Sequence, residues 1–148
     1  MESNLSKQIA AIEVGARKPV MRVGNLDATR DFTDVRDIVR AYWLALKAGE
    51  PGEVYNICTG SALSIRQLLD TLLGLSTVQG IQIKSDPQRM RPSDVLNLLG
   101  DCSKFRQATG WKPERTLDTT LRDLLTNWRD RLRKDPPGDR RPVHAHRS

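Results

Sequence analysis

The stretch GNLDATRDFTDVRD, residues 24–37, decides how the rest of the chain is interpreted. It places Arg30 and several acidic residues where an extended segment turns into a helix. Asp34 is a typical N-cap, and from Val35 onward apolar residues recur at spacings of three and four, which indicates one face of a helix. A guanidinium group at such a junction is well shaped to hold a phosphate through two parallel hydrogen bonds.

Outward from this stretch, the pattern is that of an α/β chain with few strands and several amphipathic helices. Helical spacing or capping signals are found at residues 5–12, 35–46, 65–73, 103–108 and 117–132. Short extended segments are predicted at residues 20–23, 54–58 and 81–83. The segment at 54–58 is continuously apolar in character rather than alternating, which is typical of a strand covered on both faces.

Several local signals predict where individual elements begin and end. Gly15 is the expected C-terminal cap of the first helix. Ser64 and Gln67 form an expected capping box, and Thr116 is the expected start of the last helix. Most of the aromatic residues fall on apolar helix faces and are predicted to lie in the core: Tyr42, Trp43, Phe105 and Trp128. Trp111, which follows a glycine, is predicted to be a packing anchor.

Composition argues against several classes of protein. The net charge of +6 is concentrated near the C-terminus, where residues 129–148 hold seven Lys or Arg and only three Asp. A basic stripe interleaved with aromatic residues is missing from the rest of the chain, so we expect no nucleic-acid partner. No apolar run approaches the length that spans a bilayer, so we expect no membrane partner and a cytoplasmic location. Cys58 and Cys102 have no Cys or His at zinc-ligand spacing and are expected to be buried thiols.

Five motifs, in this order and spacing, resemble the C-terminal half of the extended short-chain dehydrogenases/reductases. They are residues 24–37, EVYNICTG at 53–60, Ser64-Ile65, RPSD at 91–94 and GWKP at 110–113. The resemblance covers residues 5–132. Within that family the sequences of these motifs are most similar to those of the GDP-6-deoxy-mannose reductases, followed by the GDP-mannose 4,6-dehydratases, because Arg-Asp-Phe-Thr-Asp-Val favours a reductase.

This resemblance implies a fold, and it implies that substrate binding and cofactor binding belong to different parts of the enzyme. Residues 1–134 are expected to be the C-terminal, substrate-binding portion of a Rossmann-type enzyme, and residues 135–148 a disordered basic tail. The intact family enzyme uses NADP or NAD, but this sequence contains neither the glycine-rich dinucleotide motif nor a Tyr-x-x-x-Lys pair. We therefore expect no cofactor bound by this chain alone, no catalytic residue, no metal, and no activity in isolation.

The same resemblance implies four substrate-binding residues: Arg30, Arg91, Asp94 and Lys7. The two arginines match arginines that the family uses on the substrate's phosphates or nucleoside, and the carboxylate of Asp94 suits a ribose diol. Each also has an ordinary structural interpretation. Arg30 could pair with a nearby aspartate, Asp94 could cap a loop, and Lys7 could lie on a solvated helix face.

Three functions remain open from the sequence. The first is GDP-linked sugar binding as part of a 4-keto-6-deoxymannose reductase, and the second is the same role in a 4,6-dehydratase or epimerase. The third is a non-catalytic subunit or truncated product that docks on a separate cofactor domain, or on a second copy of itself, through exposed apolar surface. The helix that begins at Asp34 and the segment at 54–58 are the surfaces expected to lack partners.

Overall fold

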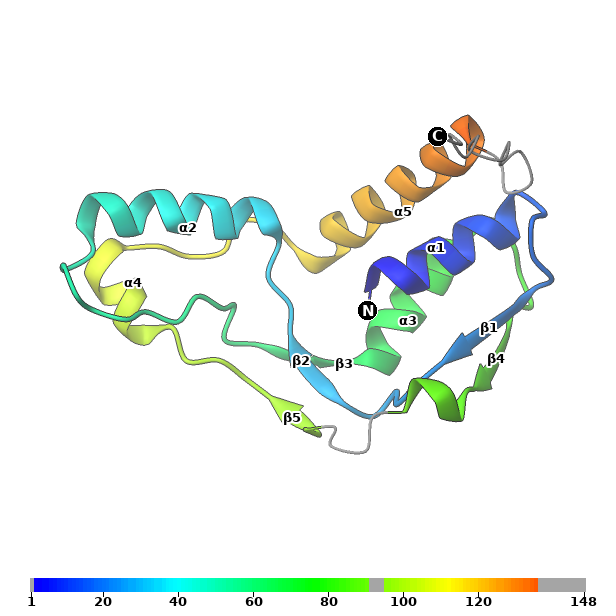
Figure 1. The fold of residues 1–148 in the computed structure, drawn as a ribbon, viewed down its shortest axis with the longest axis horizontal. Coiled ribbons are helices and arrows are strands. Elements are labelled where there is room, and N and C mark those ends of the chain that lie inside the picture. Colours follow the sequence, from blue (N-terminus) through cyan, green and yellow to red (C-terminus); the bar gives the residue numbers. More distant parts are fainter. Residues whose placement is uncertain (1, 91–94, 136–148) are drawn as a thin grey trace, which may run out of the picture.

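The computed structural model describes residues 2–90 and 95–135. Its elements gather at two ends of an elongated molecule (Figure 1). The helices α1 (Glu2–Glu13), α3 (Ile65–Gly74) and α5 (Leu117–Lys134) lie at one end with strands β1 (Val20–Val23) and β4 (Gln82–Ser85). The helices α2 (Val35–Ala48) and α4 (Ser103–Thr109) lie at the other.

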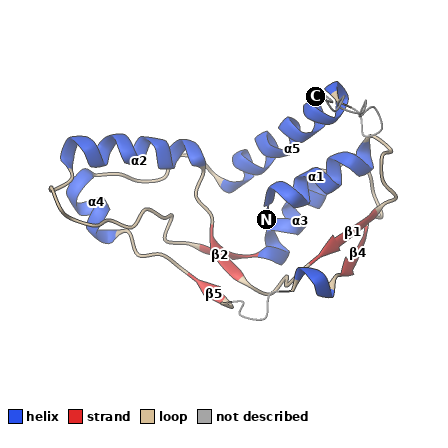
Figure 2. Cartoon of the chain, in the orientation of Figure 1, coloured by secondary structure: helices blue, strands red, loops and turns tan. Residues whose placement is uncertain are grey.

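Two small sheets complete the fold (Figure 2). In the first, β1 and β4 are parallel, with Val20 opposite Gln82 and Val23 opposite Ser85. In the second, β2 (Thr29–Asp31) is central and pairs antiparallel with β3 (Ala62–Ser64) and parallel with β5 (Asn97–Leu98). This second sheet joins the two ends of the molecule, so the motif at residues 24–37 passes through its middle strand.

The larger hydrophobic cluster holds the helices α1, α3 and α5 together. Its fully buried residues include Ile9, Leu68 and Leu121, one from each helix, together with Met21 of β1. Trp128 and Leu132 pack against this cluster from the C-terminal half of α5 and are partly buried. The apolar spacing in these three helices therefore predicted the buried faces correctly.

A second cluster lies between α2, α4 and the loops beside them. It contains Ala41, Phe105 and Trp111, with both cysteines. The rings of Phe105 and Trp111 lie with their centroids 5.9 Å apart, and the indole nitrogen of Trp111 donates to the Asp37 carbonyl at 3.1 Å. Trp111 is 1% exposed, which confirms its predicted role as a packing anchor.

The capping signals in the sequence are found where they were expected. Ser64 and Gln67 form a reciprocal capping box at the start of α3, and the hydroxyl of Thr116 accepts a hydrogen bond from Thr119 at the start of α5. Gly15 follows α1 with φ of 75°, a conformation that favours glycine. These local rules depend on neighbouring residues only, which explains why they transfer directly from sequence to structure.

Two predictions were wrong. Residues 54–58 form no strand in the described structure, because no other described strand lies beside them to share backbone hydrogen bonds. Tyr42 and Trp43 are not core residues: they are 60% and 58% exposed, and the Lys47 ammonium lies 4.6 Å from the Trp43 ring centroid. The covered side of α2 is instead the one that carries Asp37 and Ala41.

Candidate functional site

A cleft of ≈ 390 Å³ opens between α1, the end of β1 and the start of α3. Basic, polar and apolar residues line it: Asn4, Leu5, Arg22, Val23, Gly24, Asn25, Leu26, Arg30, Phe32, Ile65 and Arg89. Among these described lining residues, three are arginines and none is acidic. Such a volume lies within the usual range for small-molecule sites, and the charge suits an anionic ligand.

The turn between β1 and β2 builds one wall of this cleft. The Asn25 side chain accepts a hydrogen bond from the Asp27 amide at 3.0 Å, which is an Asx turn. The carbonyls of Leu26 and Ala28 then accept from Arg66 and Ile65, so the turn is fixed to the first turn of α3. The segment GNLDA therefore shapes the cleft mainly through its backbone.

Gly24 lets two segments approach closely at the edge of the cleft. A Cβ atom at this position would lie 2.5 Å from the carbonyl oxygen of Arg89, which is too close for any side chain. The absence of a side chain at Gly24 thus allows Arg89, sixty-five residues later in the sequence, to reach the same cleft as Arg22.

Arg30 lies on the central strand β2 and lines the cleft, while its substrate-binding role stays a prediction. Its guanidinium donates to the Thr29 carbonyl at 2.7 Å and to the Leu96 carbonyl at 3.4 Å. These carbonyl contacts set the direction of the side chain. Phe32, two residues further, places an aromatic ring in the same lining, where it offers a face for a base or a sugar ring.

Arg22 and Arg89 were missed by the sequence analysis. Arg22 occupies the outward position of β1, and its backbone amide and carbonyl are both hydrogen-bonded to the side chain of Gln8. The Arg89 side chain pairs with Asp86 at 3.3 Å and donates to Asn4 at 3.0 Å. The alternation of β1 did mark Arg22 as outward, but nothing local indicated that it shares a cleft with Arg30.

The other predicted site residues have different outcomes. Lys7 is exposed on α1, with its ammonium 5.1 Å from the centroid of the Trp128 ring, so it lies over α5. Its neighbours Asn4 and Leu5 line the cleft instead. Arg91 and Asp94 lie outside the described residues, so their substrate-binding role stays a prediction. They directly follow Arg89 and Met90 in the sequence.

The acidic residues around Arg30 have structural roles. Asp31 accepts hydrogen bonds from the Thr59 amide, the Thr59 hydroxyl and the Gly60 amide, at 2.9, 2.6 and 2.8 Å. Asp27 pairs with Arg66 at 3.2 Å. The motif therefore combines carboxylates that fix neighbouring segments with an arginine that faces the cleft.

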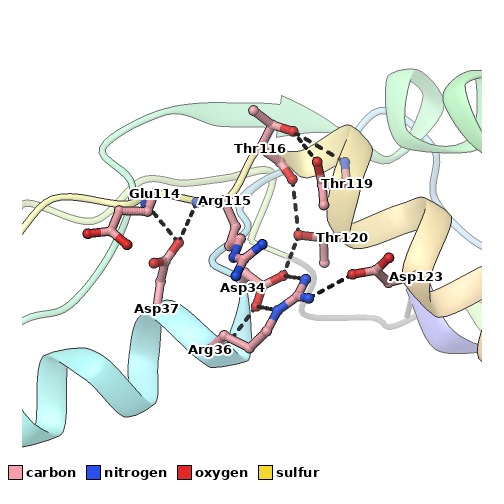
Figure 3. A network of polar contacts seen from close by, with 9 residues as sticks. All are labelled: Asp34, Arg36, Asp37, Glu114, Arg115, Thr116, Thr119, Thr120 and Asp123. Atoms are coloured by element: carbon pink, nitrogen blue, oxygen red, sulfur yellow. Dashed lines mark hydrogen bonds and ion pairs between the residues drawn. The ribbon is translucent and has the colours of Figure 1, made fainter.

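Asp34 caps α2 and also joins it to α5 (Figure 3). Its carboxylate accepts from the Arg36 amide and guanidinium and from the hydroxyl of Thr120 at 2.6 Å, while Arg36 reaches Asp123 at 2.7 Å. The Arg36 hydrogen bonds are the largest influence on this carboxyl. Together with Thr120 they outweigh burial and hold the pKa of Asp34 far below its usual value.

Asp37 connects α2 with the segment that leads into α5. Its carboxylate accepts from the amides of Glu114 and Arg115 at 3.0 and 2.9 Å and pairs with Arg40 at 3.1 Å. Figure 3 shows this side chain pointing from α2 toward those two amides. Burial alone would raise the pKa of Asp37, but the hydrogen bonds to Arg115, Arg40 and Glu114 outweigh it and lower the pKa.

Comparison with known proteins decides the family. The family model described as GDP-mannose 4,6 dehydratase matches residues 1–124, which is most of the chain. This chain belongs to the GDP-mannose 4,6-dehydratase family. The family lies within the extended short-chain dehydrogenases/reductases, as the motifs had suggested.

Two curated relatives show how the chain relates to whole enzymes. The GDP-6-deoxy-D-mannose reductase of Pseudomonas aeruginosa is 37% identical over 133 residues, which is 90% of this chain and 43% of that protein. The GDP-mannose 4,6-dehydratase of Sinorhizobium fredii is 33% identical over 138 residues, covering 81% of this chain and 38% of that protein. The chain thus spans about two fifths of the length of the relatives that it matches.

Solved structures agree with this relationship. A structure of RMD from Pseudomonas aeruginosa complexed with NADPH superposes with a TM-score of 0.81 at 36% identity, covering 88% of this chain and 42% of that chain. A UDP-glucose 4-epimerase from Thermotoga maritima with UDP-glucose gives a TM-score of 0.74 at 26% identity, covering 86% and 38%. Related structures therefore bind nucleotide cofactors or nucleotide sugars.

In residues 2–90 and 95–135, no three His, Cys, Asp or Glu side chains are grouped so that they could hold a metal ion. Over the same residues, every helix is too short or too polar to cross a bilayer.

Proposed function

We propose that this chain binds a GDP-linked 4-keto-6-deoxy sugar and forms the C-terminal, substrate-binding portion of a cytoplasmic NAD(P)-dependent reductase. The observation that carries the proposal is the cleft lined by Arg22, Arg30 and Arg89. A nucleotide sugar brings a diphosphate with about two negative charges, and guanidinium groups are the side chains best suited to it. Phe32 and the apolar wall of Leu26 and Ile65 suit the base or the sugar ring.

The reductase is preferred to a dehydratase or an epimerase because of the P. aeruginosa relative. Its identity to this chain is 37%, against 33% for the S. fredii dehydratase. A 4,6-dehydratase or epimerase substrate remains the alternative, and a uridine nucleotide is the alternative base, since similar epimerase structures hold UDP sugars. In either case the phosphates would meet the same three arginines.

The described residues do not fit a dinucleotide cofactor. Such a site needs a strand, a glycine-rich turn and then a helix whose N-terminus meets the pyrophosphate. Of the described strands, β2 and β3 do lead into helices, but residues 32–34 between β2 and α2 contain no glycine, and β3 runs directly into α3. β1 is followed by a turn into β2, and β4 by a short 3₁₀ helix, η1 (Pro87–Arg89). We therefore assign binding and orientation of the sugar nucleotide to this chain, and we assign no step of hydride transfer to its residues.

A second candidate function is that of a docking subunit, and the exposed side of α2 favours it. Val39, Trp43 and Leu46 are between 58% and 84% exposed on one face of that helix. The adjacent segment at residues 54–58 pairs with no other described strand, and Val54 is 80% exposed. A separate cofactor domain would cover both features at once, and a second copy of this chain is the other partner to test.

Calorimetric titration with GDP-linked and UDP-linked 6-deoxy sugars tests the binding proposal. Wild-type protein should bind the GDP sugar with one site, and Arg30→Ala should weaken binding by about 2 kcal/mol or more, because a charge-assisted contact to phosphate is lost. Arg122→Ala is the matched control, since Arg122 is an exposed α5 arginine paired with Asp118 outside the cleft. Equal affinities for wild type and Arg30→Ala would exclude the cleft as the phosphate site.

The role of Arg91 can be tested in the same titration. We predict that Arg91→Ala also weakens binding by about 2 kcal/mol or more, because it would remove one half of a bidentate contact. An affinity within a factor of about two of the wild type would remove Arg91 from the site, since that ratio corresponds to less than about 0.5 kcal/mol.

A further inference from the structure

The two cysteines of this chain meet in the second hydrophobic cluster. Cys58 ends the segment at residues 54–58, and Cys102 directly precedes α4. Both side chains are buried, at 7% and 3% exposure, in the same cluster, and the Cys102 thiol is one of the groups that raise the pKa of Cys58. Residues far apart in the sequence thus place two oxidisable thiols in one buried cluster, and neither residue lines the arginine cleft.

The loop before α4 lies close against Cys58. A Cβ atom at Gly100 would lie 2.6 Å from the Sγ atom of Cys58, so this glycine is what lets the loop before α4 close over the thiol. On the other side, the Arg106 guanidinium donates to the Thr59 carbonyl at 2.6 Å and ties α4 to the residue after Cys58. The two cysteine-bearing segments are therefore held together from both sides.

Cys102 lines a cleft at the surface of the molecule. A cleft of ≈ 530 Å³ is lined by Cys102 and Arg106, with Gly60, Gly100, Asp101 and Gln107. The guanidinium of Arg106 can attract the carboxylates of a small anionic molecule toward the Cys102 thiol. Burial, followed by the hydrogen bond to Cys102, raises the pKa of Cys58 to about 11, so Cys58 stays a neutral thiol near pH 7.

We propose that Cys58 and Cys102 form a reversible intrachain disulfide by exchange with a small anionic disulfide of the glutathione type. The Cys102 sulfur attacks one sulfur of that disulfide, gives up its proton and releases the first thiol. The Cys58 sulfur then displaces the second thiol from Cys102, and its own proton leaves with that thiol. Two protein thiols are oxidised to one disulfide, and the small disulfide is reduced to two thiols.

This cross-link would fix the position of the segment that otherwise lacks strand partners. Residues 54–58 are anchored by side-chain packing, such as that of Tyr55 against Phe105, rather than by a sheet. The next two residues, Thr59 and Gly60, hold the carboxylate of Asp31 beside Arg30. Oxidation would therefore stiffen the connection between the second cluster and β2.

Equilibration of the 148-residue wild-type chain with oxidised glutathione tests this proposal. We expect both thiols to be lost without retention of glutathione, an intact mass lower by two hydrogens, and a bond between the peptides that carry Cys58 and Cys102. The unfolding temperature should rise by roughly 5 °C or more, because the bond closes a long loop. Dithiothreitol should reverse both changes.

Two variants test the order of attack. Cys58→Ser should stop at a glutathione adduct on Cys102. Cys102→Ser should react much more slowly, because its remaining thiol, Cys58, does not line the cleft and has a raised pKa. Wild-type protein that keeps two free thiols, or that carries glutathione without the internal bond, would overturn the proposal. This result does not depend on whether the serine variants fold.

Discussion

At the scale of single residues, the acidic residues and the arginine of the motif around Arg30 have different roles. Asp31, Asp34 and Asp37 each accept hydrogen bonds from backbone amides, and in this way they fix loops and helix ends. Arg30 donates to two backbone carbonyls and lines the cleft. The sequence predicted the cap at Asp34 because capping is local, but the two amides that donate to Asp37 lie more than seventy residues away and no local pattern indicates them.

We predict that Arg30→Lys lowers affinity for a GDP-linked sugar although the charge is kept. A lysine ammonium lacks the planar fork that meets two phosphate oxygens, so a loss of about 1 kcal/mol or more is expected. The measurement is calorimetric, with Arg122→Lys as the control. Equal binding by the Arg30→Lys protein would show that only a point charge is needed.

Asp37→Asn should destabilise the fold by about 1–3 kcal/mol, because a buried, charge-assisted acceptor for two amides is replaced by a neutral amide with only one acceptor oxygen. The Asp37 side chain is 3% exposed, so water cannot replace the lost contacts. Urea unfolding at pH 7 measures the change. Asp118→Asn, on the exposed surface of α5, is the control and should change the free energy of unfolding by less than about 0.5 kcal/mol.

The same carboxylates predict how stability depends on pH. Folding lowers the pKa values of Glu13, Asp34 and Asp37, so their contribution is present above the unfolded pKa near 4 and is lost as pH falls through the lower folded values. The free energy of unfolding should therefore fall steadily below about pH 4. Asp37→Asn should show a shallower fall, and an identical slope would remove Asp37 from this account.

At the scale of elements, α2 shows the limit of periodicity as a guide. Its apolar residues do lie on one face, as predicted, yet Val35 and Leu46 on that face are 70% and 84% exposed. The spacing of apolar residues identifies a face but not what covers it. The covered side of α2 packs in the second cluster through Ala41, and Asp37 joins it to residues 111–115, which lie after α4 and are distant in sequence.

Because this face of α2 is exposed, substitution of a residue on it should change the free energy of unfolding little. We predict that Leu46→Ser changes the free energy of unfolding by less than about 0.5 kcal/mol. Leu125→Ala in the buried face of α5 should cost about 2–5 kcal/mol in the same urea experiment, since it opens a cavity. A large loss for Leu46→Ser would mean that the α2 face is already covered, for instance by a second copy of the chain.

At the scale of the whole molecule, the cleft is a product of topology. Asn4, Arg30 and Arg89 come from three distant parts of the sequence and meet because β1 pairs with β4 while Gly24 allows the backbone beside Arg89 to approach. The α/β class and most helices could be predicted from spacing and caps. The strands β1 and β4 were also predicted, at residues 20–23 and 81–83. The pairing of strands, the second sheet, the loss of the strand at residues 54–58 and the set of residues that line the cleft could not be predicted, because each depends on contacts between distant segments.

The central claim is that this chain binds the sugar nucleotide but supplies no hydride chemistry. The most direct test is an NADPH oxidation assay with a GDP-4-keto-6-deoxy sugar, run with the chain alone, with a separately produced cofactor domain of a matching reductase, and with the mixture. We predict no turnover by the chain alone and turnover in the mixture, reduced by Leu46→Ser. Turnover by the purified chain alone, above a protein-free blank and retained after repurification, would contradict the account.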